Sequence, residues 1–432
     1  MLKYFNGDQK NFKNKLEIIL NKRKIGRSGK LPAVKKIIAD VFKNGDNSVI
    51  QYEKKFSNLK NISNKNLKFT KIEIKTILKK LDNTIKKSID IAYDRIYRFH
   101  KNQRLTTYKI KDRYNNYCSY TVSSIETVGV YVPGGTASYP SSVLMNCIPA
   151  KIAGVKEIYM TTPALDKKFN PAVLYAAQKC GVKEIYKIGG AQAIAALAYG
   201  TKTIKKVNKI VGPGNEYVAL AKKEVFGDVG IDMIAGPSEV TVIADKHSNP
   251  DWVASDLIAQ AEHDQFSQSI LISDNKEVIF RVQKSLKKQL NTLKKKEIAK
   301  KSLNNFGLAI LVKDQNKIAE IANIIAPEHL EICTKKPEKM LKKISNAGSI
   351  FLGNYSPEAM GDYIAGTNHV LPTSGSAKFS SGLSVYDFLK RHSIIKISKS
   401  GIERLGASVI NLAKYENLEG HANSVKLRMK RK

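Results

Sequence analysis

The 432-residue sequence predicts an α/β protein built on two parallel sheets. From residue 125 onward, short runs rich in β-branched and aromatic residues end at glycine and alternate with helical stretches, which is the rhythm of strand, helix and parallel strand. The hexapeptide GVKEIY at 154–159 recurs at 181–186, after a spacing that fits one βα unit. Apolar residues make up 42% of the chain, enough to bury such cores.

The elements follow in order along the chain. Up to about residue 115, Lys-rich segments such as AVKKIIADVFKNG at 33–45 repeat their apolar residues at helical spacing, so we expect scaffold helices there. The last fifty residues, from Gly382, are less regular; VYDFLKRHS at 385–393 has a helical pattern, and we expect a small domain or tail. Strands are expected in ETVGVYVPGG (126–135), EIYMTTP (157–163), KIVGPGN (209–215), EVTVIAD (239–245), SILIS (269–273), LAILV (308–312) and SIFLG (349–353), with helices between them.

The charge is strongly basic, with 73 Lys and Arg against 38 Asp and Glu, a formal +35. Such a balance would suit a nucleic acid or an anionic membrane. The excess, however, lies in runs such as 281–301, which holds nine basic residues and one Glu at helical spacing. Because nucleic-acid grooves interleave Arg with aromatic residues, these Lys runs indicate solvated helix faces, and we expect no nucleic-acid partner.

Targeting and redox signals are absent from the sequence pattern. The first thirty residues lack the apolar stretch of a signal peptide, and no later run reaches the roughly 18 to 20 apolar residues that a membrane span needs. The four cysteines, at 118, 147, 180 and 333, form no C-x-x-C pair, so neither a disulfide framework nor a thiolate zinc site is indicated. We expect a cytoplasmic protein with reduced thiols and no membrane partner.

Three glycine-rich turns follow expected strands: VPGG at 132–135, IGGAQ at 188–192 and VGPGN at 211–215. Glycine lets a ligand approach the backbone, and the next helix offers free N–H groups to a phosphate. None completes G-x-G-x-x-G, since the last glycine position after Gly212 and Gly214 is Tyr217. One such turn is usually an ordinary strand-to-helix connection, but three in succession leave dinucleotide binding open.

Several polar residues could carry chemistry. Gln260 and His263 are three apart on an expected helix and share a face, although Gln is an uncommon zinc ligand and an exposed polar face is the alternative. Glu328 and His329 set a carboxylate beside an imidazole directly after Pro327, a pair suited to general acid and base work. Spacing alone cannot assemble these with the other candidates, which are Ser238, Asp362, His369, Glu416 and His421.

A chain of long motifs from about residue 125 to 428 closely resembles the histidinol dehydrogenase family in order and spacing. The Lys-rich first hundred residues add little to this match. The motifs are GVYVPGGTASYPSSVLMNCIPAKIAGV, GGAQAIAALAYGT, KIVGPGNEYVALAK, IDMIAGPSEVTVIAD, ASDLIAQAEHD, APEHLEI, AGSIFLGNYSPEAMGDYIAGTNHVLPT and GHANSVKLR.

The resemblance implies two incomplete Rossmann-like domains with a helical N-terminal segment and a small C-terminal tail. The expected boundaries are 1–24 for the N-terminal segment, 25–128 plus 237–381 for the first α/β domain, 129–236 for the second, NAD-side domain, and 382–432 for a dimerisation tail. It also implies a homodimer in which the tail completes the partner's active site.

The resemblance further implies site residues and a reaction. The family oxidises L-histidinol to L-histidine through L-histidinaldehyde with two NAD⁺ and one Zn²⁺ per subunit, the last step of histidine biosynthesis. Glu328 and His329 correspond to its proton-transfer pair, His329 serving the alcohol step and Glu328 activating water for the aldehyde step. By resemblance the metal ligands are Gln260, His263, Asp362 and His421; NAD contacts are Tyr131, Gln192 and Asn215; substrate contacts are Ser238, Gln260, His263, His329, Asp362, Glu416 and His421.

Two other functions are weighed against this one. A dehydrogenase of the same fold acting on another amino alcohol or a polyol would keep the glycine turns and Glu328–His329 but tolerate loss of Glu416 and His421, and both are present. A non-enzymatic nucleic-acid binder exploiting the +35 charge would let the catalytic positions decay, and they are intact.

Overall fold

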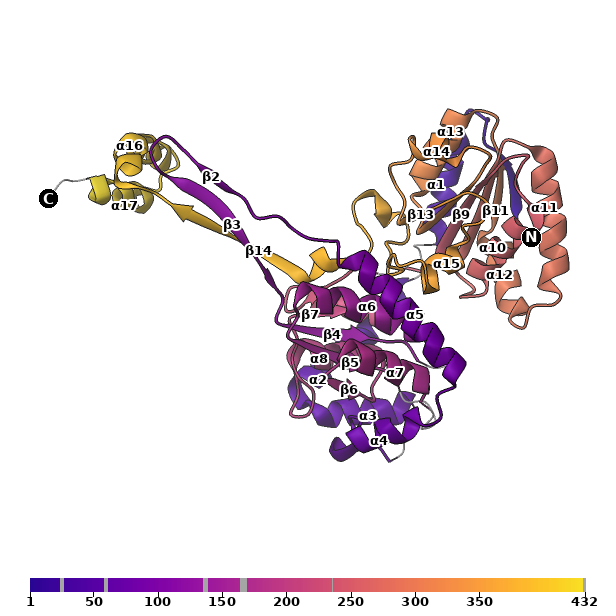
Figure 1. The fold of residues 1–432 in the computed structure, drawn as a ribbon, viewed down its shortest axis with the longest axis horizontal. Helices are drawn as coiled ribbons and strands as arrows, with labels where there is room; N and C mark the ends of the chain where they lie inside the picture. Colours follow the sequence, from indigo (N-terminus) through magenta and orange to yellow (C-terminus); the bar gives the residue numbers. More distant parts are fainter. Residues whose placement is uncertain (24–26, 58–60, 135–138, 164–168, 235, 430–432) are drawn as a thin grey trace. The chain divides into compact units, whose positions relative to one another are not determined.

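The computed structural model describes residues 1–23, 27–57, 61–134, 139–163, 169–234 and 236–429 (Figure 1). Its strands are β1 (Lys3–Asn6), β2 (Lys109–Lys111), β3 (Tyr117–Ser124), β4 (Thr127–Tyr131), β5 (Glu157–Thr161), β6 (Glu184–Tyr186), β7 (Lys209–Val211), β8 (Gly230–Ile231), β9 (Glu239–Ala244), β10 (Gln268–Ser273), β11 (Leu308–Leu311), β12 (His329–Cys333), β13 (Ser349–Leu352) and β14 (Leu389–Lys396). Its α-helices are α1 (Phe12–Lys22), α2 (Leu31–Asn44), α3 (Asp46–Phe56), α4 (Lys71–Leu78), α5 (Asn83–His100), α6 (Pro140–Ala153), α7 (Pro171–Cys180), α8 (Gly190–Tyr199), α9 (Glu216–Val225), α10 (Pro250–Ala261), α11 (Lys276–Leu290), α12 (Lys296–Phe306), α13 (Gln315–Ile325), α14 (Pro337–Leu341), α15 (Glu358–Tyr363), α16 (Lys399–Tyr415) and α17 (Glu419–Met429).

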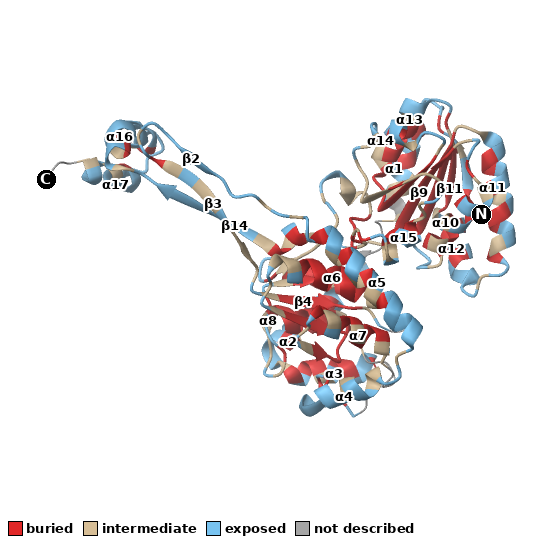
Figure 2. Ribbon diagram, in the orientation of Figure 1, coloured by how far each residue is buried: buried red, intermediate tan, exposed pale blue. Residues whose placement is uncertain are grey.

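The larger sheet has six parallel strands in the order β1-β11-β10-β9-β12-β13. Strands β9, β10 and β12 are buried along their whole length, and since alternate side chains point to opposite sides of a strand, both of their faces are covered. Val240 and Val242 of β9 pack in the core that includes residues of α10, α11 and α12, whereas Ile243 packs in the core that includes residues of α1 and α13. Figure 2 shows the buried strands at the centre of this layer.

The second sheet has five parallel strands in the order β6-β5-β4-β7-β8. Helices α2, α3, α8 and α9 form one core cluster with its residues, among them Tyr131, Tyr159 and Ile210. Helix α6 packs against α5 and α7. Two parallel sheets are therefore present, as the alternation of strand and helix predicted, and the α/β fold class is confirmed.

The repeated hexapeptide forms two equivalent units of this second sheet. Gly154 ends α6 and Gly181 ends α7, and both adopt the left-handed conformation, with φ of 88° and 81°. Glycine has no Cβ penalty there, which is why it closes each helix. The strands that follow pair in parallel, Tyr159 opposite Glu184. The repeat thus records two successive helix-to-strand connections.

Residues 104–125 and 388–432 form a separate compact unit. In it β14 pairs with β3 along its whole length in antiparallel fashion, β2 pairs with β3, and α16 packs against α17. The helix predicted from the pattern at 385–393 is wrong, because a short 3₁₀ turn at Val385–Phe388 leads directly into strand β14. Tertiary pairing with β3, which is far away in sequence, overrides the local periodicity.

Three of the expected segments differ from the groups of elements that pack together in the structure. The segment 1–24 is not only helical, because β1 adds an edge strand to the six-stranded sheet beside β11. In the stretch 25–128, buried apolar residues of α2 and α3, together with Ile62 and Leu67, pack in the core of the five-stranded sheet. The unit that contains the tail also takes in residues 104–125. All three differences arise from contacts between segments distant in sequence.

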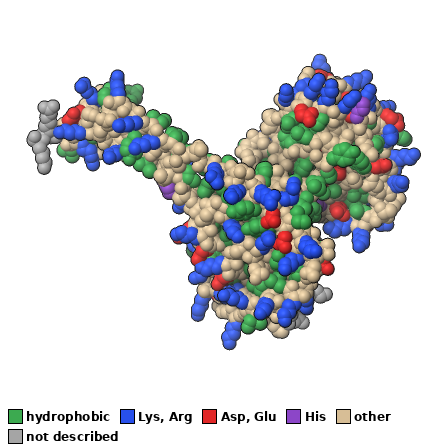
Figure 3. Space-filling model, in the orientation of Figure 1, with side chains coloured by type: hydrophobic (Ala, Val, Ile, Leu, Met, Phe, Trp, Pro, Cys, Tyr) green, Lys and Arg blue, Asp and Glu red, His purple; other side chains and the backbone are tan. Residues whose placement is uncertain are grey.

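The basic run at 281–301 lies largely on the surfaces of α11 and α12. In α11, Lys284, Lys287 and Lys288 are exposed whereas Val282 and Leu286 are buried, which is the arrangement of a solvated helix face. Figure 3 shows Lys and Arg side chains dispersed over the visible face. Among the described residues, no helix is long and apolar enough to cross a membrane.

Candidate active site

The Glu328–His329 pair lies at the amino ends of the strands of the six-stranded sheet. Helix α13 ends at Ile325, Ala326 turns the chain with a φ of 48°, and β12 begins at His329. His329 is in register with Val240 of β9 and Ser349 of β13, each near the start of its strand. Ligands of open α/β sheets usually bind at the carboxyl ends of the strands. This pair occupies the opposite edge.

The backbone of one residue of β9, Glu239, holds both members of the pair. The N–H of Glu239 donates to Glu328 Oε2 at 2.9 Å, and the carbonyl oxygen of Glu239 is 3.0 Å from His329 Nδ1. Because a carbonyl only accepts, Nδ1 must carry a proton, and the neutral imidazole therefore has its lone pair on Nε2. Nε2 is buried and has no hydrogen-bond partner among the described residues. The backbone of Glu239 thus fixes both side chains of the pair.

Carboxylates surround this imidazole. Asp362 Oδ1 is 3.5 Å from His329 Nε2, while Glu328 Oε2 and Glu358 Oε2 are each 3.8 Å from Nδ1. Burial by itself lowers the pKa of His329. The neighbouring negative charges raise the pKa by more than burial lowers it, so the net pKa lies well above its ordinary value. Burial raises the pKa of Glu328 to about 7 against the opposing charge of His329. The site therefore joins an imidazole that the surrounding carboxylates hold in its protonated form to a carboxyl group that titrates near neutrality.

Three of the expected metal ligands belong to this same compact unit. Gln260 is buried on α10, and its Oε1 has no hydrogen-bond partner among the described residues. His263 is not on that helix as expected, because α10 ends at Ala261; the N–H of His263 instead donates to Gln260 O at 3.3 Å in the turn that follows. Asp362 lies on α15 and is partly buried. Opposing charge from Asp362 acts on His263, so the two side chains share one environment.

The fourth expected metal ligand, His421, and the expected substrate contact Glu416 lie in the other compact unit. His421 is on α17 and Glu416 directly follows α16, and both side chains are exposed. Within the described residues, no group of three or more His, Cys, Asp and Glu side chains is arranged to hold a metal ion. Ser238, an expected substrate contact, is partly buried just before β9.

The three glycine turns all leave the carboxyl edge of the five-stranded sheet. They follow β4, β6 and β7, and the strand order reverses between β4 and β7. Such a reversal opens the crevice in which open α/β sheets bind nucleotides. Tyr131 ends β4 and Asn215 follows β7, so both flank this point. Gly135 of the first turn lies outside the described residues.

The expected cofactor residues have defined partners in this lobe. The Tyr131 hydroxyl accepts a hydrogen bond from Gly190 N at 3.1 Å, and burial raises the pKa of Tyr131 to about 12. Gln192 is buried and donates from Nε2 to Glu53 Oε1 at 2.8 Å. The Asn215 side chain caps α9 by accepting from Val218 N at 3.2 Å. These contacts hold the turns in place from within the protein.

Two buried ion pairs that the sequence pattern did not single out lie next to these candidate sites. One is at the amino edge of the six-stranded sheet, and the other is at the carboxyl edge of the five-stranded sheet. Arg23 forms a buried ion pair at 2.6 Å with the side chain of Glu239, the residue whose backbone holds Glu328 and His329. Lys222 and Asp232 form a second buried pair under the third glycine turn. These residues occur in segments dense in charge, where a buried Arg or Lys looks like its solvated neighbours; no sequence signal separates them.

A cysteine nucleophile is disfavoured. Cys147 is fully buried on α6, and its hydrogen bond with Cys180, together with burial, raises the pKa of its thiol well above the ordinary value. Since the thiolate is the reactive form, this thiol is a poor nucleophile. All four cysteines are free thiols.

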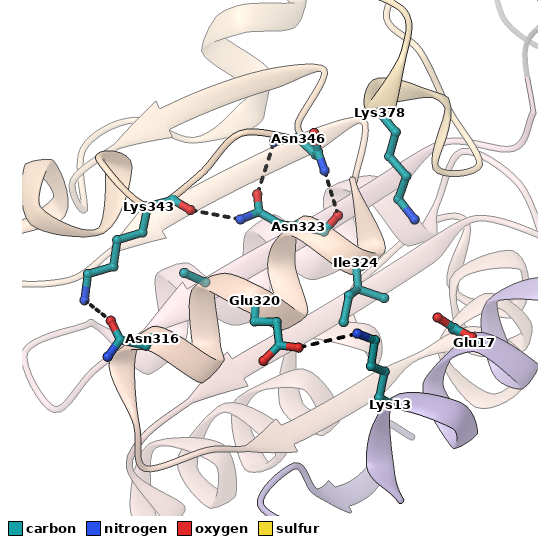
Figure 4. Close-up of a pocket in the computed structure, with 10 residues that line it drawn as sticks. Lys13, Glu17, Asn316, Glu320, Asn323, Ile324, Lys343, Asn346 and Lys378 are labelled. Atoms are coloured by element: carbon teal, nitrogen blue, oxygen red, sulfur yellow. Dashed lines mark hydrogen bonds and ion pairs between the residues drawn. The ribbon is translucent and has the colours of Figure 1, made fainter.

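A surface hollow of about 610 Å³ lies elsewhere, between α1 and α13 (Figure 4). Its lining mixes Lys13, Lys343 and Lys378 with Glu17 and Glu320, and Lys13 pairs with Glu320 across it. None of the expected site residues lines it. The chemistry described above is therefore built on the sheet edges and not in this hollow.

Comparison with known proteins agrees with the geometry. The family model for histidinol dehydrogenase matches residues 21–429. A histidinol dehydrogenase of Pelagibacter ubique (strain HTCC1062) is 54% identical over the full length of both chains, and one of Clostridium acetobutylicum is 50% identical over 93% of this chain and 92% of its own. The crystal structure of histidinol dehydrogenase from Elizabethkingia anophelis superposes with a TM-score of 0.93 at 36% identity, covering 99% of this chain and 98% of its own. The chain therefore belongs to the histidinol dehydrogenase family, and it is an oxidoreductase of histidine biosynthesis.

Proposed function

We propose that this protein oxidises L-histidinol to L-histidine through L-histidinaldehyde, a four-electron oxidation at one site that uses two NAD⁺ and one Zn²⁺ per subunit. The observation that carries the proposal is the buried Glu328–His329 pair, which the backbone N–H and carbonyl of Glu239 hold in place. The alcohol step and the aldehyde step each transfer a proton to a base, and this pair places two titratable groups side by side.

His329 serves the alcohol step. An alcohol carbon releases hydride readily only as the hydroxyl proton leaves, and we propose that His329 takes that proton at Nε2 when its imidazole is neutral. The imidazolium that results is stabilised by the nearby carboxylates of Asp362, Glu328 and Glu358. The Nδ1–H bond to Glu239 O keeps the ring from rotating during the transfer.

Glu328 serves the aldehyde step. The aldehyde must add water before a second hydride can leave, so a base must take a proton from that water. With a pKa of about 7, Glu328 combines a useful ionised fraction at neutral pH with strong basicity. The backbone bond from Glu239 N fixes one carboxylate oxygen and leaves the other for water.

The donor set fits a zinc ion. Gln260 presents a buried oxygen with no hydrogen-bond partner among the described residues, and a buried unpaired amide oxygen is costly unless a cation or donor meets it. We propose Gln260, His263, Asp362 and His421 as the ligands, an oxygen and nitrogen set compatible with Zn²⁺. When bound, the metal would grip and orient the substrate. Ser238, His329 and Glu416 complete the proposed substrate contacts.

The cofactor is assigned to the carboxyl edge of the five-stranded sheet, with Tyr131, Gln192 and Asn215 as its contacts. When bound, NAD⁺ supplies the hydride acceptor for both oxidations. The reversal of strand order between β4 and β7 supports this placement. We further propose a homodimer in which His421 and Glu416 of one chain complete the site of the other.

The proposal is tested by following NADH formation with L-histidinol and purified protein. Two NADH should form for each histidine produced, and chelation of the metal should abolish turnover until Zn²⁺ is restored. His263→Ala should lose bound metal, whereas His247→Ala, an exposed imidazole just after β9, should retain it. Full activity in verified metal-free protein, or one NADH for each histidine, contradicts the proposal.

A further inference from the structure

A buried carboxylate lies directly beneath the second glycine turn. Glu53 of α3 is fully buried, and its Oε1 accepts two hydrogen bonds, one from Gly189 N and one from Gln192 Nε2, each at 2.8 Å. Its Oε2 accepts a third bond from Ser57 Oγ at 2.6 Å. One side chain from the Lys-rich N-terminal helices thus holds both the backbone of the turn and a side chain proposed to face the cofactor.

These bonds remove the usual ambiguity of an amide side chain. The Oε1 atom of Glu53 is used as an acceptor, so Gln192 must direct its NH₂ group at it. The Gln192 Oε1 atom therefore faces the other way, and no described residue donates a hydrogen bond to it. This oxygen lies over Gly190: a Cβ built on Gly190 would come within 2.8 Å of it.

The second glycine turn is also held by a hydrogen bond to Tyr131. Gly190 has a φ of 65° and donates from its N–H to the Tyr131 hydroxyl. The N–H groups of Gly189 and Gly190, at the start of α8, are thus both used within the protein. In nucleotide-binding turns such groups normally meet a phosphate. At this helix the protein supplies acceptors of its own instead.

We propose that Glu53 is a positioning residue for the dinucleotide, which fixes Gln192 so that its carbonyl oxygen accepts a hydrogen bond from an O–H or N–H group of the bound nucleoside. The N-terminus of α8 then serves as a rigid platform for Gln192 and not as a diphosphate site. This inference rests on the proposed function, because it takes NAD⁺ as the ligand of this edge. Glu53 acts through Gln192 and need not touch the cofactor itself.

The experiment measures NAD⁺ binding to the intact, metal-loaded protein by titration calorimetry, without histidinol. Glu53→Asp shortens the side chain, so one carboxylate can no longer reach both donors, and Kd for NAD⁺ should rise about tenfold, the scale of one well-placed hydrogen bond. Glu53→Gln keeps an oxygen that accepts both bonds and an NH₂ that can donate to Ser57 Oγ, so Kd should stay within about threefold. Kd for histidinol should change in neither variant.

A double-mutant cycle separates positioning from a general loss of structure. In a Gln192→Leu background, Glu53→Asp should cause no further weakening of NAD⁺ binding, because the side chain through which it acts is gone. Asp46→Asn is the matched control: Asp46 is a buried carboxylate on the same helix that accepts from Thr201 and Thr203. It should lower the unfolding temperature and leave the NAD⁺ Kd unchanged.

The outcomes are distinguishable from those of the proposed function. If the wild-type protein binds no NAD⁺, the proposed cofactor fails and the inference with it. If the wild-type protein binds NAD⁺ and Glu53→Asp binds it equally well, only the positioning role is overturned. Additive effects of Glu53→Asp and Gln192→Leu on Kd also overturn it, since they mean that Glu53 does not act through Gln192.

Discussion

The third glycine turn should depend on the buried ion pair beneath it. Lys222 of α9 and Asp232 are almost completely buried, with side-chain exposures of 3% and 1%. Asp232 accepts from Gly212 N at 2.8 Å, and Lys222 Nζ donates to Gly212 O at 3.0 Å. The pair therefore grips both polar groups of one glycine of the turn. Replacing Lys222 by Met removes the cation and keeps most of the side-chain volume.

The expected loss in the free energy of unfolding follows from the Asp232 carboxylate, which stays buried without its cation. Removing one partner of a buried ion pair typically destabilises a protein by about 3 to 5 kcal/mol, because the other charge is left uncompensated. Asp232 would still accept from Gly212 N and from Met233 N at 2.6 Å, so we expect the lower end, about 3 kcal/mol. This corresponds to roughly a hundredfold change in the unfolding equilibrium.

The assay is urea unfolding followed by far-UV circular dichroism. Lys222→Met should lower the midpoint, and adding Asp232→Asn should recover part of the loss, since the unpaired charge is then gone. Lys156→Met is the control: Lys156 pairs with Glu126 at the surface, with exposures of 73% and 66%, and should cost less than about 1 kcal/mol. A Lys222→Met protein as stable as Lys156→Met, or a double variant no better than the single one, would refute the reasoning.

Three further predictions concern the chemistry. Glu328→Gln should slow histidinaldehyde oxidation more than histidinol oxidation, and His329→Asn should do the reverse; stopped-flow rates that are indistinguishable with the two substrates contradict the division of roles. Mixing inactive His421→Ala and His263→Ala chains should restore up to about a quarter of wild-type turnover if the sites are shared across a two-fold dimer, and no recovery despite demonstrated subunit exchange places the site within one chain. Cys147→Ser should retain steady-state activity, because its thiol is buried and has a raised pKa; loss of turnover in a folded protein would reinstate a thiol mechanism.

Much of the fold follows from local pattern. The strands expected at 239–245, 269–273, 308–312 and 349–353 form β9, β10, β11 and β13, because apolar β-branched runs closed by turns satisfy strand geometry wherever they are buried. The GVKEIY repeat gives two equivalent units, since each needs a left-handed glycine at the same point. Other strands were not predicted: β1 and β14 pair with strands far away in the sequence, and β2 forms a short hairpin with β3.

The site divides in the same way. The sequence alone determined that Glu328 and His329 are neighbours and that glycine turns follow β4, β6 and β7, because adjacency and turn chemistry are local properties. Only the tertiary structure decided that the backbone of Glu239 holds the pair and that the pair lies at the amino edge of its sheet. It also decided that Glu53 reaches Gln192, a residue 139 positions away. A buried charge is identified by the partners that compensate it, and such partners are brought together by packing and not by sequence order.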